Sequence, residues 1–144
     1  MAMPKHLKKE RLGYKIHTNC ELGMMLRGEK PLAVFSDVEG SFPAAVVRYL
    51  RIFDRHVQSG CFVKREHRST IEVSGKKRVL LTVLYALPAE MARIDEMLRL
   101  RQDMSSWTVE CERREGMLLG YTEKQNDIWI TLYRSRHECD DSRD

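Results

Sequence analysis

Three carboxylates of the sequence could together serve metal-dependent chemistry. Asp37 and Glu39 follow a short apolar run, and Glu66 lies near Lys64 in a charged segment further along the chain. A nuclease-like site needs carboxylates that converge on a divalent cation. Any charged hairpin would supply the same spacing, so we expect solvated loop residues here. A metal-dependent hydrolase or nuclease is kept as the third hypothesis.

Cys61 could act as a nucleophile with His56, five residues before it, or with His67, six residues after it. A reactive cysteine needs surroundings that stabilise its thiolate, and the sequence does not specify such surroundings. The sequence contains no glycine-rich phosphate loop, no H-E-x-x-H motif, no C-x-x-C pair and no G-x-S-x-G motif. We therefore expect no cofactor and no resident metal ion, and we favour a binding module over an enzyme.

Basic residues gather in two segments that would suit the phosphate backbone of a nucleic acid. Arg48, Arg51 and Arg55 recur at helical spacing, opposite an apolar face. The second segment, 61–78, carries six cations against two carboxylates. If both segments faced the same way, they would form one positive surface that binds phosphates. Otherwise the arginines are only the wet side of a helix. The cations of segment 61–78 are Lys64, Arg65, Arg68, Lys76, Lys77 and Arg78.

The last third of the chain contains more large apolar side chains than one thin helical layer needs. The chain has 8 methionines, and several lie in this region. Methionine and aromatic side chains are typical of protein contacts, because thioethers adapt and rings anchor. Our leading hypothesis is a small non-enzymatic binding or regulatory protein that contacts another protein or itself, as a homo-oligomer. Nucleic-acid binding is the alternative. The candidate contact residues are Met117, Tyr121, Trp129 and Tyr133.

Hydrophobic periodicity predicts the elements that would position these residues. Apolar residues recur every three to four positions in the helical segments, and β-branched residues alternate or run together in the strands. A turn centred on Gly75 would join two antiparallel strands, and Asp37 and Glu39 would lie in a loop over 36–41. The expected helices are 18–28, 43–58, 88–104, 108–119 and one from residue 122 onward, and the expected strands are 31–35 and the two halves of 61–87. Thr108 can cap the fourth helix, and Thr122 with Gln125 forms a capping-box pattern before the last, whose apolar residues also alternate as in a strand.

The 144 residues suffice for one domain, and 42% of them are hydrophobic. We expect an α+β fold: about three antiparallel strands with helices on one face and a helical C-terminal third. Residues 1–16 would form a basic arm, 17–136 the domain and 137–144 an acidic tail. No apolar run is long enough to cross a membrane, so we expect no membrane partner. Four cysteines without an apolar leader favour reduced thiols and the cytoplasm.

Overall fold

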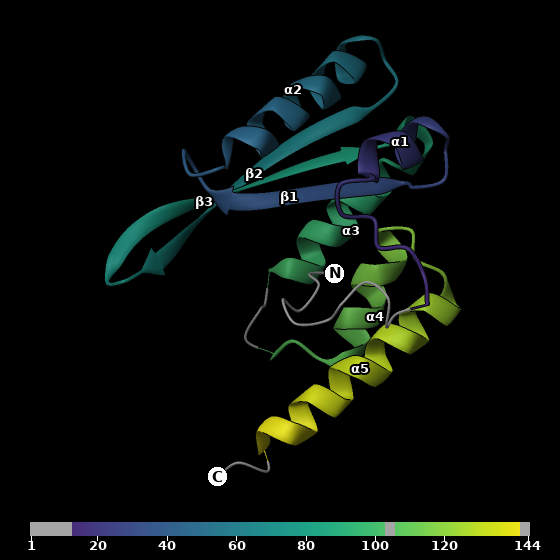
Figure 1. Cartoon of the computed structure of the whole chain (residues 1–144). Helices are drawn as coiled ribbons and strands as arrows, with labels where there is room; N and C mark the ends of the chain where they lie inside the picture. Colours follow the sequence, from purple (N-terminus) through teal and green to yellow (C-terminus); the bar gives the residue numbers. More distant parts are fainter. Residues whose placement is uncertain (1–12, 103–105, 142–144) are drawn as a thin grey trace.

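A three-stranded antiparallel sheet is the centre of the computed structural model, which describes residues 13–102 and 106–141. Its strand order is β1-β3-β2, and helices precede and follow the strands (Figure 1). The expected α+β class is confirmed. The strands are β1 (Leu32–Val38), β2 (Val63–Val73) and β3 (Lys76–Ala86), and the first helix is α1 (Glu21–Leu26).

β2 and β3 form the predicted hairpin. Ser74 and Gly75 make its two-residue turn, with φ angles of 53° and 76°. Two successive positive φ values are what a type I′ turn requires, and this turn matches the twist of paired strands. β3 is the central strand, so the nearly continuous apolar run toward its C-terminal end is buried on both faces.

Helices cover both faces of the sheet, which corrects the expectation of one helical face. On one face, α2 (Ala44–Gln58) packs Phe53 against Ala33, Val83 and Tyr85. On the other face, Leu84 packs with side chains of α3 and α4. Successive side chains of a strand point to opposite faces, so an apolar central strand needs a cover on each side. The second layer consists of η2 (Pro88–Glu90), α3 (Ala92–Arg101), α4 (Val109–Leu118) and α5 (Glu123–Asp141).

The caps of the last two helices agree with their sequence signals. Thr108 Oγ1 accepts the backbone N–H of Cys111 at the start of α4. Before α5, Thr122 N–H donates to Gln125 Oε1 and Gln125 N–H donates to Thr122 Oγ1, which is a reciprocal capping box. The segment after residue 122 is therefore a helix and not a strand, although its apolar residues also alternate.

Three differences from the predictions change which element a residue belongs to. β1 continues through Val38, paired with Leu80, so Asp37 lies in a strand and not in the expected loop. α5 continues to Asp141, so most of the expected acidic tail is helical. Of the expected basic arm, residues 1–12 lie outside the described residues, whereas Ile16 is buried against Trp129 and belongs to the domain.

The hairpin is longer than its third strand. β1 pairs with β3 only from Ala86 back to Leu80, and Glu39 N–H donates one more bond to the carbonyl of Val79. Beyond that point β2 and β3 continue as a two-stranded extension of four residue pairs, from Thr70↔Val79 to Val73↔Lys76. We call residues 70–79 the β-ribbon. It projects from the end of the sheet at which α2 begins (Figure 1).

Candidate nucleic-acid interface

The outer face of α2 carries three arginines and no acid. Arg48, Arg51 and Arg55 are exposed, as their spacing predicts. Asp54 is the one carboxylate of the helix, and its Oδ1 accepts from Tyr85 Oη at 2.8 Å and lies 2.8 Å from Lys64 Nζ. None of the three arginines forms an ion pair with any residue in the described ranges. The helix therefore presents an uncompensated cationic face.

The cations at the base of the hairpin, in contrast, are paired with carboxylates. Lys64 pairs with Asp54 and lies 3.4 Å from Glu66 Oε1. Arg65 pairs with Asp95 of α3. Exposed ion pairs such as these contribute only about 0–1 kcal/mol to stability. They matter here because a paired cation is less available to a phosphate than an unpaired one.

The cations of the β-ribbon resemble those of α2. Lys76, Lys77 and Arg78 are exposed, and no described carboxylate lies within ion-pair distance of them. Glu72 is opposite Lys77 in the strand register, but the two side chains do not pair. Of the nine basic residues predicted for binding, the structure thus leaves six unpaired within its described parts, on α2 and on the ribbon.

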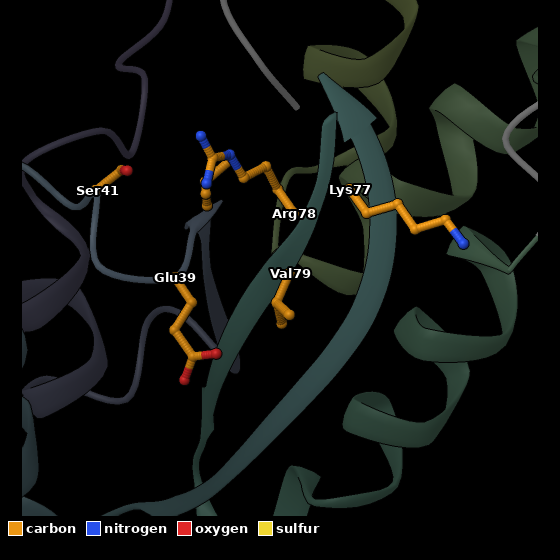
Figure 2. A pocket seen from close by; sticks show the side chains of 6 residues that line it. Glu39, Ser41, Lys77, Arg78 and Val79 are labelled. Atoms are coloured by element: carbon orange, nitrogen blue, oxygen red, sulfur yellow. The ribbon is translucent and has the colours of Figure 1, made fainter. Parts of the chain in front are cut away.

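A cleft of about 500 Å³ lies at the root of the ribbon, and we call it the root cleft. In Figure 2 the Arg78 guanidinium extends toward the side on which Ser41 lies, while Lys77 points to the opposite side of the ribbon. The loop that carries Ser41 leads directly into α2. The root cleft therefore lies beside the ribbon cations and next to the start of α2, although none of the three α2 arginines lines it. Its lining residues are Val38, Glu39, Ser41, Lys77, Arg78 and Val79.

The three carboxylates of the metal hypothesis do not form a metal site. Arg68 Nε lies 3.0 Å from Glu39 Oε1, and its NH2 lies 3.2 Å from Glu66 Oε2, so a guanidinium occupies the point where two of the acids meet. Asp37 Oδ1 instead accepts the backbone N–H of Val38. Over the described parts of the chain, no three His, Cys, Asp or Glu side chains are placed to share a metal ion.

Cys61 is exposed and reduced. Its Sγ accepts a hydrogen bond from Ser59 Oγ at 3.4 Å, so a hydroxyl contacts the sulfur. The ring of His56 packs on Phe62 instead, with 5.6 Å between the ring centroids. A hydroxyl does not stabilise a thiolate as an imidazolium does, so this arrangement gives the cysteine–histidine idea no geometric support.

Two of the four predicted contact residues lie inside the protein. Tyr121 is 6% exposed and stacks on His17 with 3.8 Å between the ring centroids. Trp129 is 4% exposed, and its indole N–H donates to Glu112 Oε1 at 2.6 Å. Buried tyrosine and tryptophan are stable where their polar groups find partners, and both rings do so here. Proposing them as surface residues was wrong, whereas Met117 is 50% exposed and Tyr133 is half-buried.

Met117 borders a groove between two helices of the second layer. The groove has a volume of about 590 Å³ and lies between the η2–α3 segment and α4. Acids and arginines are mixed along it, and Arg93 crosses toward α4 by donating to the carbonyl of Met117. The other lining residues are Ala89, Glu90, Ala92, Glu96, Glu110, Arg113, Arg114 and Leu118.

Sequence reasoning missed a buried lysine. Lys30 is 2% exposed, and its Nζ donates to the carbonyl of Leu119 at 2.6 Å and lies 2.8 Å from His17 Nδ1. Burial lowers the Lys30 pKa to about 7. Burial and then the Lys30 charge lower the His17 pKa to about 4. The side chain ties the N-terminal segment to the C-terminal helices, and no signal in the sequence marks it, because lysines are nearly always exposed.

A second missed residue is Glu112, which accepts two indole hydrogen bonds. Trp107 Nε1 donates to Oε2 at 2.7 Å, and Trp129 Nε1 donates to Oε1. Both carboxylate oxygens are therefore occupied by neutral donors inside the helical layer. The two tryptophans and the glutamate lie 5 and 17 positions apart in sequence, so only the fold brings them together.

Comparison with known proteins identifies no relative of this chain. No protein-family model matches the chain, and no curated protein or solved structure is significantly similar to it. Among the described helices, none is both long enough and apolar enough to cross a membrane. Function is therefore inferred from the charge and shape of the surface.

Proposed function

We propose that the protein binds nucleic acid through the outer face of α2 and the β-ribbon. The observation that carries this proposal is the division of the basic residues into paired and unpaired sets. Lys64, Arg65 and Arg68 are held by carboxylates at the base of the hairpin. The set without an ion pair to any described residue is Arg48, Arg51, Arg55, Lys76, Lys77 and Arg78.

Unpaired exposed cations have a clear energetic advantage for binding phosphates. Each contact with a phosphate releases condensed counterions, and this release drives most non-specific binding. A guanidinium also matches two phosphate oxygens with its planar fork. An arginine that must first break its ion pair with a carboxylate gains less free energy from a phosphate contact. The root cleft is lined by Arg78 of the ribbon and by Glu39 and Ser41 of the segment before α2, and the Glu39 carboxylate is paired with Arg68.

The test is a binding titration with two triple variants of equal charge. A fluorescent nucleic acid of about 20 nucleotides, single- or double-stranded, is titrated with the full chain and followed by anisotropy. R48A/R51A/R55A removes the unpaired arginines of α2. R27A/R65A/R68A removes three arginines that pair with Glu29, Asp95 and Glu39. We expect a large loss of affinity in the first variant and a small loss in the second.

Two results of this titration would overturn the proposal. One is the absence of saturable binding to any nucleic acid at low salt. The other is an equal loss in both variants, because net charge alone would then account for the binding. Vesicles of phosphatidylserine serve as a competitor, since exposed Val47 and Ile52 lie among the arginines of α2. If vesicles displace the nucleic acid when their lipid phosphate concentration is below the phosphate concentration of the nucleic acid, the face is assigned to a membrane surface instead.

Self-association through the groove beside Met117 is the second candidate function. The exposed thioether and a hollow of about 590 Å³ favour it. The groove is lined by three acids and three arginines, so the same surface could pair with itself around a two-fold axis. Light scattering on the full chain and on Met117→Glu tests it. A dimer that the substitution dissociates supports this candidate, and a monomer at high concentration removes it.

A further inference from the structure

The β-ribbon has the dimensions of an element that enters a DNA groove. Four residue pairs extend beyond the third strand, and at about 3.3 Å per residue they rise about 13 Å. The major groove of B-DNA is about 12 Å wide and about 8.5 Å deep, and it admits a two-stranded ribbon. The tip could therefore reach the base edges while the root remains level with the phosphates.

The side chains along the ribbon suit the same position. Lys76 adjoins the turn and Arg78 lies nearer the root, with Lys77 between them on the opposite face. Lysine and arginine bind the acceptors of guanine in the major groove, and apolar groups such as exposed Val73 contact the thymine methyl. At the root, Arg78 and Ser41 border a cleft that could receive a backbone phosphate.

The same features argue against other nucleic acids. Single strands are held by aromatic side chains on which bases stack, and residues 70–79 contain no aromatic residue. On α2 the rings of Tyr49 and Phe53 belong to the core cluster and are not part of its outer face. Double-stranded RNA has a deep, narrow major groove that protein elements do not enter. Only duplex DNA offers a groove that fits the ribbon.

We infer that the nucleic acid is duplex DNA and that the β-ribbon, residues 70–79, inserts into its major groove while the arginines of α2 contact the adjacent phosphates. This inference rests on the proposed function. Chain continuity supports it, because the loop 39–43 leaves the end of β1, beside the ribbon root, and leads into the first turn of α2 (Figure 1).

The experiment compares three ligands of one sequence and two variants of the full chain. Duplex DNA, duplex RNA and single-stranded DNA are titrated with the unmodified chain, with K76A/K77A/R78A and with R48A/R51A/R55A. We expect duplex DNA to bind at least about tenfold more tightly than the other two ligands. The ribbon variant should remove that preference, and the α2 variant should weaken all three ligands alike. Unchanged thermal unfolding shows that each variant folds, since all six residues are exposed.

Groove ligands give an independent readout. Methyl green, which occupies the major groove, should displace the protein from duplex DNA, and netropsin, which occupies the minor groove, should not. Equal affinity for the three ligands, or displacement by netropsin alone, overturns the inference and leaves nucleic-acid binding standing. Failure of every ligand to bind overturns the proposed function itself, so the two failures are distinguishable.

Discussion

Arg68 of β2 donates from Nε to Oε1 of Glu39 over 3.0 Å, and this pair marks where the hairpin changes character. Glu39 lies directly after β1, and its backbone N–H bonds to Val79, the last point at which β3 contacts a third strand. Up to this point the cations of the hairpin are paired. Beyond it, on the β-ribbon, they form no ion pair with any residue that the structure describes.

Neutralising Glu39 should strengthen nucleic-acid binding. In Glu39→Gln the guanidinium of Arg68 loses the nearer of its two carboxylate partners and keeps only Glu66 at 3.2 Å, so it becomes more available to a phosphate. We expect the salt dependence of log K to steepen by up to about 0.9 for duplex DNA, with higher affinity at low salt. Glu123→Gln, at the exposed start of α5, changes the net charge equally and is the control. Equal gains in the two variants would contradict the role given to the Arg68–Glu39 pair.

Burial of Lys30 should appear in the pH dependence of stability. The pKa of Lys30 is about 7 in the folded state and 10.5 in its ordinary state. Between these values the unfolded chain binds more protons, so the free energy of unfolding rises with pH, by up to about 1.4 kcal/mol per unit. Urea unfolding at pH 7, 8 and 9 should show this rise, and Lys30→Met should lose it.

His17→Gln is the control for this prediction. Burial lowers the Lys30 pKa, and His17 does not contribute. The rise in the free energy of unfolding between pH 7 and 9 should therefore persist in His17→Gln. A Lys30→Met protein with the slope of the unmodified chain would show that the lysine is protonated and solvated in the folded state. Tyr14 and Tyr49 are half-buried and their pKa values are raised, so they titrate only above about pH 10, outside the range of the measurement.

Glu112→Gln should destabilise the helical layer. The carboxylate accepts from two indoles, whereas an amide has only one oxygen and would place its NH₂ against the other indole N–H. Leaving one buried donor without an acceptor costs about 1–3 kcal/mol. Denaturant unfolding followed by tryptophan fluorescence measures this cost. Glu110→Gln, exposed on the same helix, should change stability by less than about 0.5 kcal/mol, and a similar small change for Glu112→Gln would refute the network.

Gly120→Ala should cost more than Gly28→Ala. Both glycines have positive φ, 96° and 75°, and this conformation costs other residues about 1–2 kcal/mol. A Cβ on Gly120 would also lie 2.6 Å from Cδ of Pro31, whereas a Cβ on Gly28 meets nothing within 4 Å. We expect a loss of at least about 2 kcal/mol for Gly120→Ala and about 1 kcal/mol for Gly28→Ala. Equal losses of stability in the two variants, measured by thermal unfolding, would show that Pro31 moves aside.

Local patterns predicted the elements well, because periodicity and turn chemistry act over a few residues. The apolar face of α2, the turn at Gly75 and the Thr122–Gln125 capping box are examples. The helical cover on both faces of the sheet was missed. The apolar run of β3 indicated two buried faces, but periodicity does not show which helix covers which face.

The site was predictable only as a set of candidates. Which cations are unpaired depends on acids distant in sequence: Glu39 lies 29 positions from Arg68, and Asp95 lies 30 from Arg65. The same limit explains the error over Tyr121 and Trp129, because a large ring is equally suited to a core and to an interface. Lys30 shows the opposite case, a charged residue that the fold encloses.

The salt dependence of duplex binding by the two arginine triple variants tests the central claim most directly. If the α2 arginines contact phosphates, R48A/R51A/R55A should flatten the plot of log K against log salt by up to about 2.7. R27A/R65A/R68A, which removes the same charge from paired positions, should flatten it by less than about 1. Equal slopes in the two variants would contradict the claim that the unpaired cations of α2 form the binding surface.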